Sequence, residues 1–404
     1  MPESLCNLRV KPFVFDLGKD KNTMMKKFLA GTTALIAVGS FASAANAAEP
    51  IKLSVGGFMN QWVSIADVDA KNTNQNGQVN WEFNNVAVNS DTEVHFKGET
   101  VLDNGLKVAV VIEKEAERTD TGANGRNADQ QYAEISGGWG AVRVGETLNA
   151  ATRVHSSAPG AGAGVSDAVT VLGVGVASGN AVTDLASQVT SVDGINDAGA
   201  GSTAIDYVSP MFGPFAFGIT YTPRVFSRGL AQEGTTSKDL LGAALVYADK
   251  WGPVAVNADV AYARFEQLEG SAQNGMAHGV PVGIKLGYAG FEVGGSYFRI
   301  MDNAKIASTA TGTSYDGVAW DAGIAYTTGD WKFGYQYYSS SLEGSLAQRG
   351  RDTTKVHNVG MAYTMGPGVS VSANLSHLTL TEETRTSSDK TTAAGLITGI
   401  QLAF

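Results

Sequence analysis

Residues 91–99 read DTEVHFKGE, and their side chains alternate strictly between two kinds. One phase contains Asp91, Glu93, His95, Lys97 and Glu99, and the other contains Thr92, Val94, Phe96 and Gly98. A period of two with the charges on one face predicts a β-strand whose two faces meet different surroundings. The same alternation recurs at residues 215–221, 254–262, 318–326 and 331–337. The chain is therefore predicted to be all-β.

Short and long connections alternate between the predicted strands. Seven tight turns are expected, at residues 103–105, 137–140, 210–214, 251–253, 289–290, 328–330 and 366–368. Eight long connections are expected, at residues 67–79, 118–128, 150–201, 224–237, 268–279, 303–315, 342–352 and 382–390. They delimit about sixteen strands, each near the ~10 residues that a tilted membrane strand requires. Short turns at one end and long loops at the other predict a transmembrane antiparallel β-barrel.

The carboxyl-terminal strand also fits a closed barrel. Leu396, Thr398, Ile400, Leu402 and Phe404 share one phase, and Phe404 is the final residue. A sheet inside hydrocarbon needs partners for every backbone group, so it cannot have a free edge. We therefore expect the strand that ends at Phe404 to close the barrel by pairing with residues 51–65.

One connection is much longer than the rest. Residues 150–201 contain, from residue 158, APGAGAGVSDAVTVLGVGVASGNAVTDLASQVTSVDGINDAGAG, without an aromatic residue. A disordered linker between two β domains is one interpretation, but such linkers are usually polar and rich in charge. The repeated Val, Leu and Ala residues favour a loop that is folded inside the barrel and packs through small side chains.

The amino terminus has the features of an export signal. Residues 24–47 contain a basic start at Lys26 and Lys27, an apolar run, and an A-x-A cleavage site at residues 45–47. Residues 1–23 are interpreted as an upstream extension that is absent from the mature protein, and residues 48–404 as the barrel domain. The only cysteine, Cys6, precedes the cleavage site. The mature chain can therefore form no disulfide and no cysteine-based metal or catalytic site.

The mature chain is acidic. Removing the six basic and three acidic residues of 1–47 from the totals of 29 and 39 leaves 23 and 36, a formal charge of −13. An excess of negative charge argues against nucleic acid as a partner, because phosphate backbones bind basic surfaces.

The mature chain resembles the trimeric general-diffusion porins of Gram-negative outer membranes, particularly the alphaproteobacterial type. The resemblance is carried by the leader, by GAVRVGETLNAATR at 140–153, by STAIDYVSPMFGPFAFGITYTP at 202–223, and by Phe404. It implies a homotrimer in contact with outer-membrane lipid, and a third external loop, here 150–201, that folds into the pore. The acids of that loop, Asp167, Asp184, Asp193 and Asp197, would form the constriction, although family loops usually carry a denser acidic cluster.

A barrel of about sixteen strands encloses an aqueous lumen, whose charged lining sets selectivity. By phase, the inward cations are Lys52, Lys97, Lys107, Arg143, Lys285 and Lys332. The inward acids include Glu113 and Glu134, together with Asp91, Glu93, Glu99, Glu115, Asp206, Asp259 and Asp321. Each of them either lines the pore or merely solvates a rim. The resemblance implies a basic wall opposite the acidic loop, and Arg143 and Lys107 are the first candidates for this wall.

The predicted function is passive diffusion of small hydrophilic solutes and ions through a weakly cation-selective channel. A substrate-specific sugar or phosphate channel and a soluble exported β-protein such as an adhesin are the alternatives. An enzyme is not predicted, because His377 of the Ser376–His377 pair falls in the apolar phase and HExxH is absent. No cofactor is expected. Asp-rich loops have the chemistry to bind Ca²⁺, but no segment matches a defined calcium motif, so metal ligands stay unassigned.

Overall fold

The computed structural model describes residues 50–71, 84–116, 128–172, 202–225, 238–268, 274–302, 313–345, 350–381 and 390–404. The predicted upstream extension, the signal peptide and its cleavage site at residue 47 lie outside these ranges. So do Asp184, Asp193 and Asp197 of the long loop.

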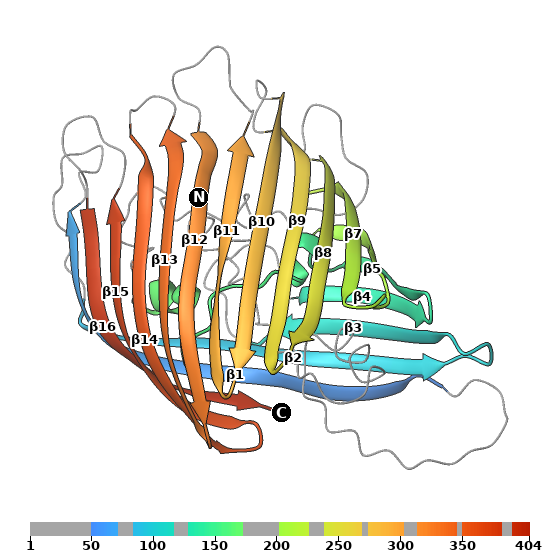
Figure 1. Ribbon diagram of the computed structural model, residues 1–404, viewed down its shortest axis with the longest axis horizontal. Coiled ribbons are helices and arrows are strands. Elements are labelled where there is room, and N and C mark those ends of the chain that lie inside the picture. Colours follow the sequence, from blue (N-terminus) through green and yellow to red (C-terminus); the bar gives the residue numbers. More distant parts are fainter. Residues whose placement is uncertain are drawn as a thin grey trace.

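The described chain forms a closed antiparallel barrel of sixteen strands in which each strand pairs with its sequence neighbours (Figure 1). The strands are β1 (Lys52–Lys71), β2 (Val86–Val101), β3 (Lys107–Glu115), β4 (Ala128–Gly137), β5 (Gly140–Glu146), β6 (Thr203–Val208), β7 (Phe215–Arg224), β8 (Lys238–Trp251), β9 (Val254–Leu268), β10 (Asn274–Tyr288), β11 (Phe291–Asp302), β12 (Thr313–Thr328), β13 (Trp331–Ser345), β14 (Asp352–Gly366), β15 (Val369–Thr381) and β16 (Lys390–Ala403). The predicted fold class and strand number are confirmed.

Short turns and long connections alternate around the barrel, as predicted. The turn between β8 and β9 contains Gly252 and that between β10 and β11 contains Gly290, with φ angles of 60° and 84°. Glycine adopts this left-handed conformation without the steric cost that a side chain would add, so these turns need only two residues. Because short turns and long connections alternate between antiparallel strands, all the short turns lie at one end of the barrel and the long connections at the other.

The barrel closes through β1 and β16. Met59 lies opposite Leu402 in the register of this pair, and Ile65 lies opposite Leu396. At the turn end, the amide of Gly57 donates to the carbonyl of Phe404 at 2.9 Å, and the amide of Phe404 donates to Gly57 at 3.1 Å. The terminal residue thus completes the last backbone pairing of the sheet.

The alternation of side chains separates the two surfaces of the barrel wall. In β7, Phe215, Ile219 and Tyr221 are exposed on the outside, whereas Ala216 and Thr220 are buried inside. The outside is apolar with many aromatic rings, and the inside is polar or small, which is the reverse of a water-soluble sheet barrel.

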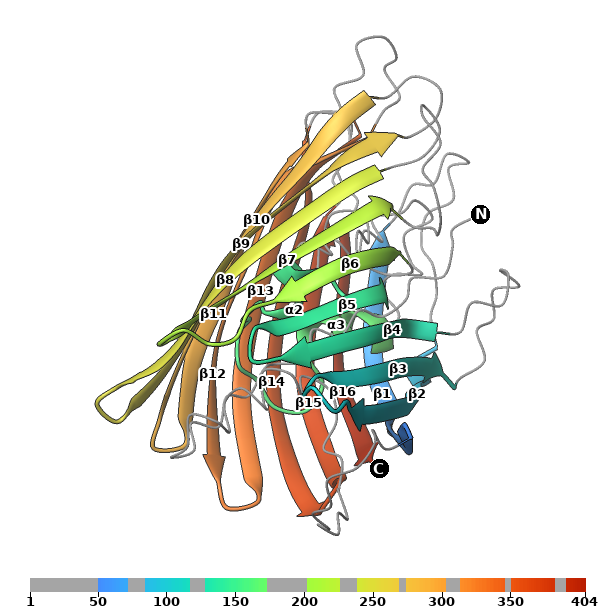
Figure 2. The same cartoon turned by 90° about the vertical axis from the view of Figure 1, so that its right-hand side faces the viewer.

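The barrel wall is uneven in height, as Figure 2 shows. Strands β8–β16 have 12–16 residues, whereas β5 has seven and β6 has six. The described part of the connection between β5 and β6 contains two helices, α2 (Ala150–Arg153) and α3 (Val165–Val171). Within the described ranges, neither is long enough to cross a membrane.

The hydrophobic core lies inside the barrel, between the long connection and the wall. Val169 and Leu172 pack in one buried cluster with Trp62 of β1 and Ile397 of β16. A sheet closed on itself would leave a large lumen, so the inserted segment supplies the surface against which these inward side chains are buried.

Candidate functional site

The described part of the long connection, residues 147–172, follows the inner wall of the barrel as a strap. We use the name strap for these residues. Its first helix, α2, contacts β6–β9, and its second, α3, contacts β1, β2, β13 and β14. The prediction of a loop folded into the pore is therefore confirmed for the described part of residues 150–201.

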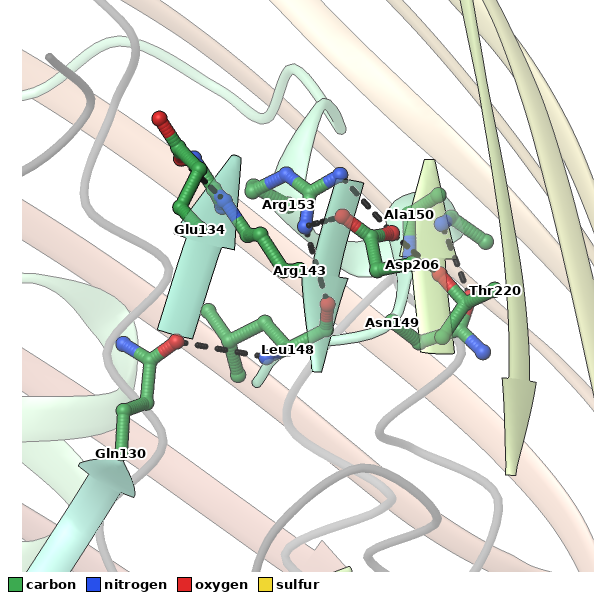
Figure 3. Close-up of polar contacts among 10 residues, drawn as sticks. Gln130, Glu134, Arg143, Leu148, Asn149, Ala150, Arg153, Asp206 and Thr220 are labelled. Atoms are coloured by element: carbon green, nitrogen blue, oxygen red, sulfur yellow. Dashed lines mark hydrogen bonds and ion pairs between the residues drawn. The ribbon is translucent and has the colours of Figure 1, made fainter. Parts of the chain in front are cut away.

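The strap begins with a set of polar contacts to β6 and β7 (Figure 3). Asn149 caps α2, since its Oδ1 accepts from the amide of Ala151 at 2.9 Å. The amide of Ala150 donates to Thr220 Oγ1 at 2.7 Å. Arg153 forms an ion pair with Asp206 at 2.9 Å, and Asp206 also accepts from Thr220 Oγ1 at 2.7 Å. Asp206 is fully buried, and its negative charge is balanced by Arg153 of the strap.

Two further carboxylates hold the next part of the strap. Asp259 of β9 accepts from the amide of Ser156 at 2.7 Å and lies 2.9 Å from His155 Nδ1. Asp321 of β12 accepts from the amide of Ala158 at 3.0 Å. The side chains of His155 and Asp259 are both almost completely buried. These acids therefore bind backbone amides of the strap.

Amide side chains continue the line of anchors across β13–β15. Gln336 Nε2 donates to the carbonyl of Ala158 at 2.9 Å, and Asn358 Nδ2 donates to that of Ala163 at 2.7 Å. Asn374 acts as both donor and acceptor: its Nδ2 donates to the carbonyl of Ala161, and its Oδ1 accepts from the amide of Ala163, each at 2.9 Å. The strap has no sheet partner here, and these amides satisfy its backbone groups.

Glycines on the inner face of the wall make room for the strap. A Cβ at Gly323 would lie 2.5 Å from the carbonyl oxygen of Pro159, and one at Gly334 would lie 2.7 Å from the amide nitrogen of Ala161. The same close approach to the strap occurs at other inward positions, Gly218, Gly242, Gly283, Gly360 and Gly395. Glycines from β7 to β16 thus form a row against which the strap packs, with its backbone at Gly283, Gly323, Gly334 and Gly360 and with its side chains at Gly218, Gly242 and Gly395.

This arrangement corrects one expectation from the sequence. Asp206, Asp259 and Asp321 do point inward, as their phase predicts, but they do not line water. The side-chain period identifies the face of a strand, whereas the strap that covers this face comes from 53 to 163 residues away in the sequence.

Charged side chains also gather on the inner face of β2–β5. Arg143 Nε donates to Glu134 at 2.8 Å, and its guanidinium lies 4.9 Å from the ring centre of Tyr132. Glu113 accepts from Gln130 at 2.7 Å. The predicted wall residues Arg143 and Glu134 therefore form a buried ion pair, and Glu113 is buried in a separate hydrogen bond with Gln130.

Several predicted wall cations lie near the turn end of the barrel instead. Lys107 begins β3 directly after a tight turn and lies 2.7 Å from Glu99, while Lys97 lies 4.0 Å from the same carboxylate. Lys332 is the second residue of β13 and lies 3.1 Å from Glu292. Lys52 begins β1 and is exposed. The rim interpretation thus fits Lys52, Lys107 and Lys332 better than a position at the constriction.

The remaining predicted site residues lie on other elements. Lys285 is buried on the inner face of β10. Asp167 is the third residue of α3, and its carboxylate accepts from the amide of Gly164 at 2.9 Å. Because this contact caps the helix, Asp167 stabilises the strap whether or not it also faces the solution.

Acidic side chains are concentrated on β2 and β3. The ligand atoms of Glu93, His95 and Glu113 lie within 4.8 Å of one another, and those of Asp91, Glu93 and Glu115 do likewise. His95 Nε2 lies 2.6 Å from Glu93 Oε2. Carboxylate oxygens attract hard cations, so these buried acids give this part of the wall a negative charge.

The Ser376–His377 pair has no catalytic geometry. Ser376 points inward and donates to Asn358 Oδ1 at 2.9 Å, whereas His377 is exposed on the outer face of β15. A base that activates a nucleophile must lie within hydrogen-bond distance of it.

The sequence analysis missed the anchors Asn149, His155, Gln336, Asn358 and Asn374. One signal for them was present in the sequence. In β13 and β14, Gln336 and Asn358 share a phase with Gly334 and Gly360, which is unusual for a face that only meets water. Small residues beside amides on one face indicate that another backbone packs there.

Known structures resemble this barrel along most of its length. An anion-selective porin from Comamonas acidovorans superposes with a TM-score of 0.58 and 16% identity, covering 88% of this chain and 100% of that one. The trimer form of OmpT from Vibrio cholerae gives 0.58 and 11%, covering 89% and 100%. The outer membrane channel DcaP of Acinetobacter baumannii gives 0.58 and 13%, covering 91% and 100%. At these identities the likeness shows the fold alone.

Curated sequences give no significant match. The sequence model of one family, described as Gram-negative porin, matches residues 31–382, which is most of the chain. The closed barrel, the loop inside it and this match agree, and the protein belongs to the Gram-negative porin family.

Proposed function

We propose that the protein forms a water-filled channel in the outer membrane for passive diffusion of small hydrophilic solutes and ions. The observation that carries this proposal is the asymmetry of the barrel interior. The main contacts of the strap helices are with β6–β9, β13, β14, β1 and β2, while further charged side chains gather on β2–β5. An interior with fixed charges on one side favours hydrated solutes over apolar ones.

Weak cation selectivity is the finer part of the proposal. Asp91, Glu93, Glu113 and Glu115 supply four carboxylates on two adjacent strands. The mature formal charge of −13 acts in the same direction. The relative from Comamonas acidovorans is described as anion-selective, and it shares only 16% identity, so charge rather than fold must decide selectivity here.

The test is the reversal potential across a planar bilayer with a KCl gradient. The wild type is expected to prefer K⁺ at about 0.1 M salt, and Glu93→Gln with Glu113→Gln is expected to reduce this preference. The effect should be much smaller at 1 M, because the screening length falls from about 10 Å to about 3 Å. Asp239→Asn, whose carboxylate accepts from Tyr221 on the outer face, is the control.

A preference of the wild type for Cl⁻ would refute the selectivity without affecting the channel. Saturable block of the ion current by an added sugar or by phosphate would instead support a substrate-specific channel. The absence of any conductance would refute the proposed function itself.

We also propose a homotrimer. Strands β5 and β6, with seven and six residues, extend only about 20–23 Å, which is less than the ~30 Å hydrocarbon core. Their outer side chains Val144 and Ile205 are nevertheless apolar and exposed. A second and third copy of the chain would cover this short wall. One structural relative is described as a trimer form.

The proposed function requires neither catalysis nor a cofactor. Selectivity would come from fixed charges on the wall, and permeation would need only an aqueous path. Ca²⁺ at the long loop, considered from the sequence, has less support than weak attraction of cations to the acids of β2 and β3.

A further inference from the structure

The inner face of β2 and β3, which are neighbours in the wall (Figure 2), carries an imidazole between two carboxylates. Glu93 and His95 are two residues apart on β2, so both side chains point into the barrel. Glu113 of β3 lies directly opposite His95 in the register of the two strands. The ligand atoms of the three residues lie within 4.8 Å of one another, and the residues are only 2–8% exposed. One imidazole nitrogen and two carboxylate oxygens therefore converge at one buried position.

The negative charge of this set is not balanced by a basic side chain. Neither Glu93 nor Glu113 forms an ion pair with a lysine or an arginine in the described part of the chain. Arg143 of β5 is paired with Glu134 instead. Two ionised carboxylates outweigh even a protonated imidazole, and burial of an unbalanced charge is costly. A bound cation between the two carboxylates would remove this cost.

Neighbouring side chains hold two of the three groups in place. Gln130 of β4 donates from Nε2 to Glu113 at 2.7 Å, and its Oε1 accepts from the amide of Leu148 at 3.3 Å (Figure 3). The Leu148 contact determines which end of the Gln130 side chain faces Glu113. The ring of Phe58 packs edge-on against His95, with ring centres 5.9 Å apart. Hydrogen bonds and packing behind the ligands are typical of metal sites, because they orient the ligand atoms.

A cavity of about 460 Å³ lies beside His95 and gives the set a route to the solution. Asn60, Ser370 and Gln401 are among its polar lining residues, together with Gly368. Because Gly368 belongs to the tight turn between β14 and β15, the cavity reaches the end of the barrel where the short turns lie. An ion could therefore enter from this end, with room for a water molecule or a small ligand beside it.

We propose that Glu93, His95 and Glu113 bind one divalent transition-metal ion of the Zn²⁺ type, with an open coordination position toward the cavity. An imidazole ligand favours Zn²⁺, Cu²⁺ or Ni²⁺, whereas Ca²⁺ and Mg²⁺ prefer oxygen ligands alone. Three protein ligands leave the fourth position of a tetrahedral ion for water. Ligand atoms at about 2.1 Å from such an ion lie about 3.4 Å apart, so side-chain movements of roughly 1 Å close the site.

The experiment is calorimetric titration of Zn²⁺ into the mature, tag-free protein in mild detergent, after treatment with EDTA and removal of the chelator. One ion per chain is expected, and excess Ca²⁺ should not displace it. Cu²⁺ then serves as a probe, because its electron paramagnetic resonance spectrum reports the nitrogen ligands, and one nitrogen is expected. The proposal goes beyond passive diffusion, and the titration needs no ion flow. Its failure is therefore distinct from a failure of the proposed channel.

His95→Gln should remove the nitrogen signal of bound Cu²⁺. Glu113→Gln keeps the size of the side chain and should weaken Zn²⁺ binding at least about 100-fold, because even the loss of a partner behind a ligand costs about 10–100-fold. Glu99→Gln is the matched control, since Glu99 lies on the same face of β2 but pairs with Lys107 at 2.7 Å, and binding should not change. A heat-dependent shift on a gel verifies that each variant is folded.

Two nitrogen ligands on Cu²⁺, lost in His357→Gln, would overturn the site, because the rings of His357 and His377 lie 6.3 Å apart on the outer face. Displacement of Zn²⁺ by Ca²⁺ would overturn the assignment to a transition metal. Equal losses in Glu113→Gln and Glu99→Gln would overturn the assigned ligands. The absence of saturable Zn²⁺ binding would refute the proposal altogether.

Discussion

Gly360 illustrates how single residues hold the strap against the wall. It lies on the inner face of β14, where a Cβ would overlap the carbonyl oxygen of Ala161 and crowd the side-chain amide of Asn374. The strap backbone can approach this strand only because no side chain intervenes. The hydrogen bonds that the side-chain amides of Asn358 and Asn374 donate to the strap depend on that approach.

We predict that Gly360→Ala displaces the strap from the wall toward the lumen and lowers single-channel conductance. The displaced strap would also lose hydrogen bonds to buried groups, at about 1–3 kcal/mol for each group left unsatisfied. Gly366→Ala on the same strand is the matched control, because no atom lies within 4 Å of its added Cβ. Unchanged conductance in Gly360→Ala would show that the strap does not bound the permeation path.

At the scale of elements, the strap and the rest of the long connection have separable roles. All the strap residues that the polar anchors hold lie at residues 149–171. The last of these contacts is made by Ser64 of β1, whose Oγ donates to the carbonyl of Val171 at 3.2 Å. The pairing of the sixteen strands does not involve residues of the connection.

Deletion of residues 173–194 is therefore predicted to leave the barrel assembled and to raise its conductance. The physical reason is that strand pairing and the anchors are retained while chain is removed from the connection that enters the pore. Conductance in a planar bilayer measures the effect, and heat-modified gel migration verifies assembly. A deletion variant with wild-type conductance would place residues 173–194 outside the narrowest section.

The acids of this connection are predicted to contribute to cation preference. Replacement of Asp184, Asp193 and Asp197 by Asn should shift the reversal potential toward zero at low salt, and much less at 1 M, where the screening length is about 3 Å. Asp167→Asn should be tested separately, because its carboxylate also caps α3. If the triple variant keeps the wild-type reversal potential, these acids do not face the permeating ions.

At the scale of the whole molecule, the uneven wall predicts the mode of assembly. The short side, β5 and β6, exposes Val144 and Ile205 without the strand length to span hydrocarbon. Unheated protein should therefore migrate on a gel far above the monomer and collapse to it on boiling. Val144→Arg should favour the monomer, because it places a charge in the proposed interface.

The matched control is Val293→Arg on β11, whose side chain is similarly exposed on the tall side. It should weaken membrane insertion, by about 2–4 kcal/mol for a charge near the bilayer midplane, without dissociating the oligomer. A wild-type monomer by light scattering in mild detergent would contradict the trimer.

Processing between Ala47 and Ala48 is predicted for the exported protein, because residues 45–47 form an A-x-A site after an apolar run. Intact-mass analysis of protein from the outer membrane tests this expectation. A mature amino terminus before Met25 would refute the signal-peptide interpretation.

The sequence alone determined the barrel, its sixteen strands, the alternation of turns with loops and the closure at Phe404. These features follow from a period of two and from turn residues, which are local properties of the chain. Only the tertiary structure decided the roles of the inward residues. Asp259 and Asn374 gain their partners from a strap more than 100 residues away, and Lys107 lies at a rim because its strand begins there. Side-chain phase cannot reveal such contacts, because it specifies a face but not what lies against it.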